Sequence, residues 1–224
     1  MVEGAERDAL LAKAADLPQF PLNSREASDL EMIATGAMSP LEGFMGQADY
    51  DNVVANMRLA NGTPWPLPVV LATKDGVDAP AAGSEIALVG EDGTDFGVMQ
   101  VSDVWSPDKK NELDKCYSGT GGQADESHPA WGYLSSIGDT YIGGTITVAN
   151  LPSYAKHNDY RLTPAQTRAA FEEKGWNTVV AFQTRNPIHR AHEYLTKVAL
   201  EQTDGLLVHP LVGDTKSDDI PSDT

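Results

Sequence analysis

Residues 183–192 of the chain read QTRNPIHRAH, and they join an apolar run at residues 178–182 to a helix-patterned segment at residues 188–202. Pro187 fits the first position of that helix, and Asn186 can act as its cap. The apolar run is short enough for a buried strand. This part of the chain therefore predicts a strand, a tight turn and a helix, with polar side chains gathered at the turn.

His189 and His192 are three residues apart, so both side chains are expected on one face of the first helical turn. A histidine pair can ligate zinc, but metalloprotease-type ligation uses positions four apart with a glutamate between them. Here Arg190 lies between the histidines, and its charge opposes a second cation. We therefore expect no protein-bound metal. A capped surface helix whose histidines bind only backbone carbonyls is a further alternative, which the density of Gln, Arg, Asn and His side chains disfavours.

The chemistry of this turn favours a multiply anionic ligand. Unpaired backbone N–H groups at the start of a helix attract negative charge. Arg185 adds a cation with bidentate geometry, and Gln183 adds an amide that can bind an oxygen atom without carrying charge. Residues 183–200 carry more basic than acidic side chains, in a chain whose net charge is −17. An anion site is therefore expected to be local.

The same stretch resembles the Gln-x-Arg-Asn-Pro-x-His-x-x-His signature of the ATP sulfurylases, and it matches every fixed position. The wider group of nucleotidyltransferases has a His-x-Gly-His signature, in which a small third residue lets the nucleotide approach the helix. Ala191 keeps that position small. Two further blocks agree with the family, GAMSPLEGFM at residues 36–45 and VHPLVG at residues 208–213. The resemblance therefore extends over nearly the whole chain.

An α/β protein of two domains is predicted. Residues 1–152 are expected to form an N-terminal PUA-like β-barrel domain. Its β-type runs are at residues 67–73, 85–89, 96–104 and 140–149, separated by Gly, Pro, Asn and Asp. A short helix at residues 28–35 is predicted before them, with Ser28 and Glu31 as a capping box. In residues 36–45 we expect Leu41, Phe44 and Met45 to pack inward, and in residues 118–129 we expect a surface loop.

Residues 153–224 are expected to form the N-terminal portion of a Rossmann-like nucleotidyltransferase domain. Thr163, Pro164 and Gln166 predict a capped helix that Gly175 can end. The strand, turn and helix described above follow, and then a strand at residues 205–210. This order is a βαβ unit with parallel strands, in which a ligand binds beyond the carboxyl ends of the strands.

The resemblance implies an enzyme, a sulfate adenylyltransferase of sulfate assimilation and sulfur metabolism. A sulfate oxygen would attack the α-phosphorus of ATP in line, pyrophosphate would leave, and adenosine 5′-phosphosulfate would form. The reaction is reversible and needs no nucleophilic side chain. Magnesium would arrive bound to ATP, held by water and phosphate oxygens, because no carboxylate cluster for an all-protein site is visible.

Each signature residue receives an expected role. Gln183 and Arg185 would bind sulfate, because a planar fork suits a tetrahedral oxyanion. The phosphates of ATP would contact Asn186, His189 and His192. The catalytic set is Arg185, Asn186, His189 and His192, and the further ATP contacts are His209 and Gly213.

Composition excludes several other classes of protein. The net charge of −17 repels nucleic acid and anionic membranes, and no apolar run approaches membrane-spanning length. Residues 1–15 are acidic and alanine-rich, unlike a secretory signal. Cys116 is the only cysteine, which fits a reducing compartment. We therefore expect a cytoplasmic protein, and the family implies a homo-oligomer.

The chain is also expected to be an incomplete enzyme. It ends in a polar run at residues 217–224, and the second nucleotide-site motif of the resembling enzymes, Gly-Arg-Asp-His-Ala-Gly, does not occur in it. A separate polypeptide, the rest of a longer chain or a partner subunit would cover the sheet edge at residues 205–210, and the chain alone would be inactive. Two other functions remain open: a nucleotidyltransferase with another small anionic acceptor, and a non-catalytic PUA-like binding module.

Overall fold

The computed structural model describes residues 1–119, 122, 125–154 and 156–211. The chain divides into a first compact unit, Met1–Arg161, and a second unit that begins at Leu162 and is described to residue 211. The sequence suggested a division between residues 152 and 153. Between that point and Leu162 lies a single 3₁₀ turn, Asn158–Tyr160, in the part of the chain that the structure describes.

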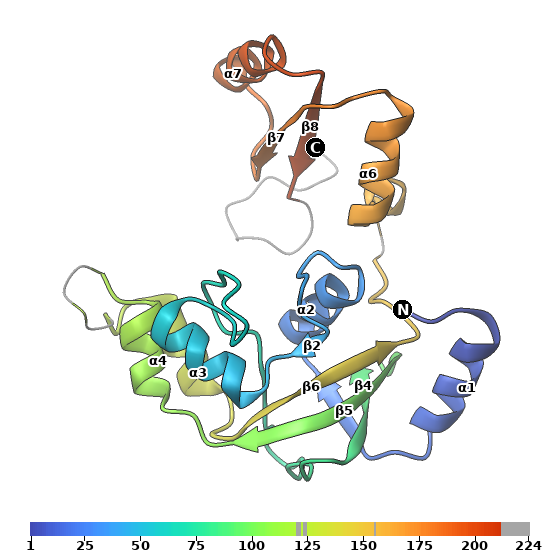
Figure 1. The fold of residues 1–224 in the computed structure, drawn as a ribbon, viewed down its shortest axis with the longest axis vertical. Coiled ribbons are helices and arrows are strands. Elements are labelled where there is room, and N and C mark those ends of the chain that lie inside the picture. The colour runs from blue at the N-terminus through green and yellow to red at the C-terminus, as the bar shows by residue number, and fades with distance from the viewer. Residues whose placement is uncertain (120–121, 123–124, 155, 212–224) are drawn as a thin grey trace. The chain divides into compact units, whose positions relative to one another are not determined.

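The first unit is built around one mixed sheet (Figure 1), which has six strands among the described residues. The strand order is β1-β4-β5-β6-β2, and β3 pairs with β6. All these pairs are antiparallel except β1 with β4, which is parallel. The strands are β1 Gln19–Leu22, β2 Gly43–Phe44, β3 Leu71–Ala72, β4 Glu85–Gly90, β5 Asp95–Trp105 and β6 Tyr141–Val148.

Three of the predicted β-type runs are confirmed almost residue for residue as β4, β5 and β6. The run at residues 67–73 is shorter than predicted, because only Leu71 and Ala72 pair, with β6. Neither β1 nor β2 was predicted. β1 is four residues long and contains Pro21, which lacks the N–H that a ladder uses.

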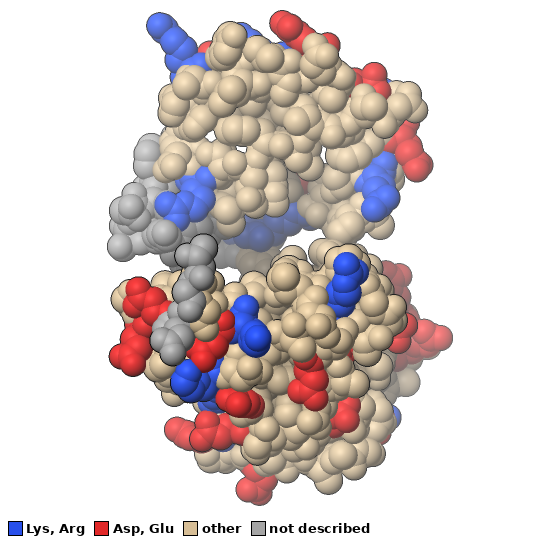
Figure 2. All heavy atoms as spheres, turned by 60° about the vertical axis from the view of Figure 1, so that its left-hand side comes forward, with Lys and Arg blue, Asp and Glu red and all other residues tan. Residues whose placement is uncertain are grey.

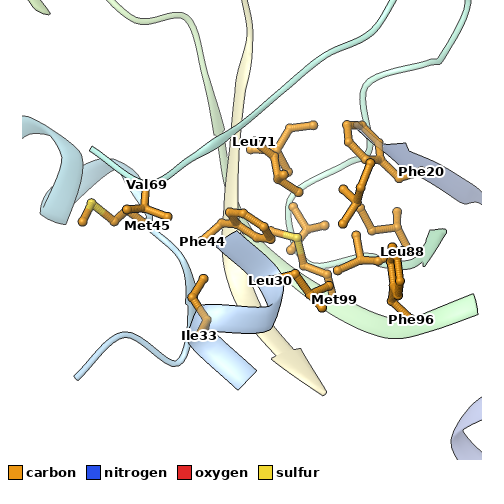
Figure 3. Packing of buried hydrophobic residues seen from close by; sticks show 14 of the residues in the cluster. Phe20, Leu30, Ile33, Phe44, Met45, Val69, Leu71, Leu88, Phe96 and Met99 are labelled. Atoms are coloured by element: carbon orange, nitrogen blue, oxygen red, sulfur yellow. The ribbon is translucent and has the colours of Figure 1, made fainter. Parts of the chain in front are cut away.

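The main core lies on one face of the sheet, under helix α2 (Ser24–Ala34). Figure 3 shows its side chains converging from separate elements, among them Phe20 of β1, Leu30 of α2, Phe44 of β2 and Met99 of β5. Each of these four is at most 2% exposed. Segments far apart in the sequence therefore share one apolar interior.

Helix α1 (Gly4–Ala14) covers the opposite face of the sheet (Figure 1). Ala14 packs there against Ala87 and Val98 in a small separate cluster. Ala87 alternates along β4 with Ile86 and Leu88, which belong to the main core. Because successive side chains of a strand point to opposite faces, β4 is buried on both sides. This double burial explains its continuous apolar sequence.

Helix α2 begins four residues earlier than the sequence predicted. Its cap is Asn23, whose side chain accepts from the backbone N–H of Glu26 at 3.0 Å, while the Glu26 carboxylate accepts from the Asn23 N–H at 2.9 Å. Ser28 lies inside the helix, and its hydroxyl donates to the Ser24 carbonyl at 2.9 Å. The predicted capping box was therefore placed on the wrong pair of residues.

Three further helices of the first unit were not predicted: α3 Gln47–Asn56, α4 Lys109–Cys116 and α5 Pro129–Ser136.

The predicted inward packing of residues 36–45 is confirmed, since Phe44 and Met45 are each 2% exposed and Leu41 packs against the main core. Part of the surface loop predicted at residues 118–129 lies outside the described residues.

The second unit contains α6 (Pro164–Glu173), β7 (Val179–Thr184), α7 (Arg190–Leu200) and β8 (Gly205–Pro210). The predicted capping box of α6 is confirmed, with Thr163 as cap and Gln166 as its partner. Gly175 follows the helix with φ of 69°, a conformation that favours glycine. β7 and β8 are parallel, so the predicted βαβ unit is present.

Apolar side chains of the second unit remain largely uncovered. Among its described residues, Thr196 is the one buried side chain, and no large hydrophobic side chain is buried. On α7, Tyr194 is 68% and Leu195 57% exposed. The second unit therefore lacks an apolar core of its own in the part of the chain that the structure describes.

Candidate functional site

Parallel pairing brings the two motif blocks of the second unit together. In the register of β7 with β8, Gln183 lies opposite His209, and Thr184 lies opposite Pro210. Both positions are at the carboxyl ends of their strands. Gln183 and His209 are exposed there, so their side chains are accessible to a ligand.

Asp204 secures the other ends of the same two strands. Its carboxylate accepts from the backbone N–H groups of Asn177 at 2.9 Å and Thr178 at 2.8 Å, and from the Thr178 hydroxyl at 3.0 Å. These bonds hold the pKa of Asp204 below its usual value. Gly205 leaves room for the Trp176 ring, since a Cβ atom there would lie 2.1 Å from it. The strand register is thus fixed at the end remote from the motif.

The turn after β7 is closed by one hydroxyl group. Thr184 Oγ1 donates to the Asn186 carbonyl at 2.9 Å and accepts from the Asn186 N–H at 3.1 Å. Asn186 lies in this turn and does not cap α7, whose cap is His189. The prediction that α7 starts with Asn186 and Pro187 was wrong, because the chain makes this turn before the helix begins.

His189 is the cap of α7, with extended backbone angles. Its Nδ1 accepts from the Ala191 N–H at 3.3 Å. In a neutral imidazole the other nitrogen then carries the proton. Nε2 of His189 is therefore a hydrogen-bond donor at the amino end of α7, where the helix dipole also favours an anion.

The rings of His189 and His192 stack, with their centroids 3.8 Å apart and their planes tilted by 32°. This contact confirms that the two side chains share one face. Phe182 of β7 packs on the His192 ring at a centroid distance of 5.4 Å. His192 Nδ1 is buried and has no hydrogen-bond partner among the described residues. A buried polar atom without a hydrogen-bond partner is unfavourable.

Other charges near the motif include one ion pair. Glu193 in the first turn of α7 binds Lys197 at 2.6 Å, which lowers the pKa of the Glu193 carboxyl group. Arg185 is half-buried, whereas Asn186 is exposed. The structure describes no group of three or more His, Cys, Asp or Glu side chains that could hold a metal ion. Gly213, the remaining predicted contact, lies outside the described residues.

The negative charge of the chain is not gathered in one patch on the face drawn in Figure 2, where acidic side chains form several separate groups with Lys and Arg between them. Because the net charge of −17 gives no long-range attraction for an anion, attraction has to come from groups close to the motif. None of the helices that the structure describes is long and apolar enough to span a membrane.

Thr184 is a residue of this turn that the signature does not indicate, because it occupies a variable position. Its chemistry could have indicated it: a hydroxyl side chain at a strand end, two residues before Asn186, can close a turn through its own oxygen.

Comparisons with known proteins agree with this geometry. Residues 1–151 match the family model of the PUA-like domain. Residues 158–224 match the family model named ATP-sulfurylase. These matches confirm the predicted fold class, an α/β protein with an N-terminal PUA-like domain.

Curated relatives match the chain over nearly its full length. A sulfate adenylyltransferase of Symbiobacterium thermophilum is 50% identical over 222 residues, which cover 99% of this chain and 55% of the relative. A probable bifunctional SAT/APS kinase 2 of Sorangium cellulosum is 49% identical, over 99% of this chain and 38% of the relative. The chain thus spans about half the length, or less, of these relatives.

A solved structure described as a hexameric APS kinase from Thiobacillus denitrificans superposes with a TM-score of 0.75. It is 30% identical, and the match covers 97% of this chain and 38% of that one. The match to the PUA-like model covers more than half of the chain, which therefore belongs to the PUA-like domain family, and residues 158–224 match the ATP-sulfurylase model.

Proposed function

We propose that this chain supplies the sulfate and phosphate contacts of a sulfate adenylyltransferase, which converts ATP and sulfate into adenosine 5′-phosphosulfate and pyrophosphate, reversibly. The observation that carries the proposal is the stacked pair His189 and His192 at the amino end of α7, beside the carboxyl end of β7. Two relatives that are 50% and 49% identical in sequence carry names that support the same reaction.

In this proposal Arg185 and Gln183 bind sulfate at the end of β7. Arg185 provides a charged fork, and Gln183 provides a neutral amide that adds affinity without excess charge. His209, opposite Gln183 in the register, lies on the neighbouring strand and contacts the nucleotide. Gly213 is proposed as a nucleotide contact from the resemblance alone.

Asn186, His189 and His192 contact the phosphates. His189 Nε2 donates a hydrogen bond, and the backbone at the amino end of α7 adds partial positive charge. The sulfate oxygen attacks the α-phosphorus directly, and pyrophosphate leaves on the opposite side. The protein then acts by holding two mutually repelling anions in line and by stabilising the charge that gathers in the transition state.

Magnesium bound to ATP would neutralise part of the triphosphate charge. Phosphate oxygens and water would hold this cation, because Mg²⁺ commonly keeps several waters and binds through substrate phosphates. The proposal therefore assigns no residue of this chain to a metal.

The second unit needs a polypeptide partner for its apolar surface. Tyr194 and Leu195 of α7 are exposed, and β8 has no strand on its outer edge among the described residues. Because uncovered apolar area of this kind marks an interaction surface, we propose that further polypeptide completes the domain. The 224-residue chain by itself is then inactive, and the complete protein is a cytoplasmic homo-oligomer that binds neither nucleic acid nor membrane.

We also propose limits for the two domains. Residues 1–152 are assigned to the PUA-like domain and residues 153–224 to the first portion of the catalytic domain. The absence of an internal apolar core in the described part of the second unit supports a catalytic domain that extends beyond the residues present here.

The experiment is a chimera of this chain with the Symbiobacterium relative, in which the chain replaces the segment that it matches. We expect ATP–pyrophosphate exchange that depends on sulfate in the chimera, and little or none with the 224-residue chain alone. Exchange that depends on another anion would favour a different acceptor. A chimera that folds but shows no exchange with any anion would overturn the proposed function.

A further inference from the structure

Thr184 occupies a variable position of the signature, yet its hydroxyl group closes the turn that carries two of the signature residues. We propose that Thr184 is a positioning residue: its hydroxyl holds the backbone of Arg185 and Asn186 in the conformation that binds the anionic substrate. This inference rests on the proposed function and assigns to that site a residue that touches no substrate itself.

Both backbone groups of Asn186 depend on this one side chain. Thr184 Oγ1 donates to the Asn186 carbonyl oxygen at 2.9 Å, and it accepts from the Asn186 N–H at 3.1 Å. The backbone of Arg185 lies between the two bonded residues and is enclosed in the resulting ring. Because Pro187 follows and has no N–H, the next residue cannot donate a backbone hydrogen bond.

The backbone of Thr184 is in turn fixed to the neighbouring strand. Thr184 pairs with Pro210 in the β7–β8 register, and its carbonyl accepts from the Leu211 N–H at 2.9 Å. The hydroxyl therefore connects the turn to the paired strands β7 and β8. Through this residue, Arg185 and Asn186 have a defined position relative to His209 on β8.

Ordering of the turn before the ligand arrives improves affinity, since a free backbone would lose conformational entropy on binding. Without the hydroxyl, the Asn186 N–H and carbonyl would bind water, because this residue is exposed. The fold would change little, but the guanidinium of Arg185 would no longer be held for the anion. We therefore expect the change to act on anion binding more than on global stability.

The test compares three variants. Thr184→Val removes the hydroxyl at nearly constant shape, and Thr184→Ser retains it. Thr203→Val is the matched control: Thr203 is also half-buried, and its hydroxyl lies 3.3 Å from both the Ala199 and the Gly205 carbonyl oxygens, between α7 and β8. All are made in the chimera described above: titration calorimetry with adenosine 5′-phosphosulfate measures affinity, and amide hydrogen exchange followed by NMR reports on the Asn186 N–H.

We expect Thr184→Val to bind adenosine 5′-phosphosulfate about tenfold more weakly, which corresponds to about 1.4 kcal/mol, and to exchange its Asn186 amide hydrogen faster. Thr184→Ser and Thr203→Val should keep the wild-type affinity and the wild-type exchange at Asn186. Wild-type affinity in Thr184→Val would overturn the inference and leave the proposed function intact. Equal weakening in Thr203→Val would also overturn it, because the effect would then be one of general stability. No binding by a folded chimera without these substitutions would overturn the proposed function, and this inference with it.

Discussion

The carboxyl group of Glu112, on α4, lies in the interior of the first unit and is only 2% exposed. The hydroxyl of Tyr50 donates to it at 2.9 Å and that of Tyr141 at 3.1 Å. Burial raises the pKa of Glu112, while the two hydroxyls and the charge of Lys109 lower it in part. Lys109 itself binds the Ile137 carbonyl at 2.6 Å and Asp139 at 2.8 Å. Glu112 is therefore more stable in its protonated form than an exposed glutamate.

The pH dependence of stability should reveal this group. Because the folded-state pKa of Glu112 is raised, its contribution is full below the ordinary value of 4.5 and is lost as the pH rises through the folded value. Glu112→Gln cannot ionise. The free energy of unfolding of this variant, measured in urea, should therefore improve relative to wild type as the pH rises from acidic to neutral.

Asp139→Asn is the control for the Glu112 prediction, because the pKa of Asp139 is lowered by its bond to Lys109. Its contribution is present above the ordinary pKa and is lost as the pH falls, so this variant should change the slope in the opposite direction. A Glu112→Gln curve parallel to wild type at every pH would contradict the prediction.

Arg185 is the residue on which the proposed sulfate contact depends. In the chimera, Arg185→Ala should lose about 2 to 4 kcal/mol of transition-state stabilisation, the usual scale for a charged donor in a site that excludes water. Arg185→Lys should recover little of it, because a point charge cannot replace the bidentate fork. The measurement is kcat/KM for sulfate. Wild-type kinetics in the alanine variant would remove Arg185 from the site.

At the scale of elements, the two misplaced helix starts have one cause. The sequence offered Ser28 for α2 and Asn186 for α7, and both are good capping residues by type. In the structure Asn23 and His189 do the capping. Which residue caps a helix depends on where the preceding strand ends. That strand is β1 for α2 and β7 for α7.

A pair of alanine variants tests the observed start of α2. Asn23→Ala should lower the free energy of unfolding by about 1 kcal/mol, because it removes the side-chain acceptor for the Glu26 N–H. Ser28→Ala, at the position predicted from sequence, should change it by less than about 0.5 kcal/mol. Urea unfolding of both proteins gives the comparison. The reverse order of effects would show that α2 begins at Ser28 in solution.

At the scale of the whole molecule, apolar burial is confined to one part. Every buried hydrophobic side chain among the described residues lies in Met1–Arg161. The second unit instead exposes Ile188, Tyr194, Leu195, Val198 and Leu211, each by more than 40%. Since hydrophobic burial is the main stabilising force in folding, the first unit should be the more stable of the two.

Binding of a hydrophobic fluorescent dye should locate the uncovered surface. The full chain should bind the dye, and a fragment of residues 1–161 should bind much less while it still unfolds cooperatively. In the full chain, replacement of both Tyr194 and Leu195 by serine should reduce dye fluorescence, because both side chains are exposed on α7. Equal dye binding by the fragment and the full chain would place the apolar surface in the first unit.

Several features of this protein followed from local sequence. The long strands β4, β5 and β6 were predictable because each is a run of apolar and β-branched residues between turn residues. Helix α6 was predictable because Thr163 and Gln166 form a capping box, with Pro164 at the first helical position. The grouping of Arg and His side chains at a strand-to-helix turn likewise indicated an anion site without knowledge of the fold.

Other features depended on contacts between distant residues. β1 forms because Phe20 pairs with Leu88 of β4, and β2 forms because Phe44 pairs with Gly144 of β6, so neither strand has a local signal. Helix α1 buries only Ala14, which leaves almost no apolar periodicity to detect. The stacking of His189 on His192 and the closure of the turn by Thr184 required coordinates, because they depend on where the strand ends. Propensity and capping chemistry act over a few residues, whereas short strands, buried pairs and the exact start of a helix are set by whichever distant segment lies against them.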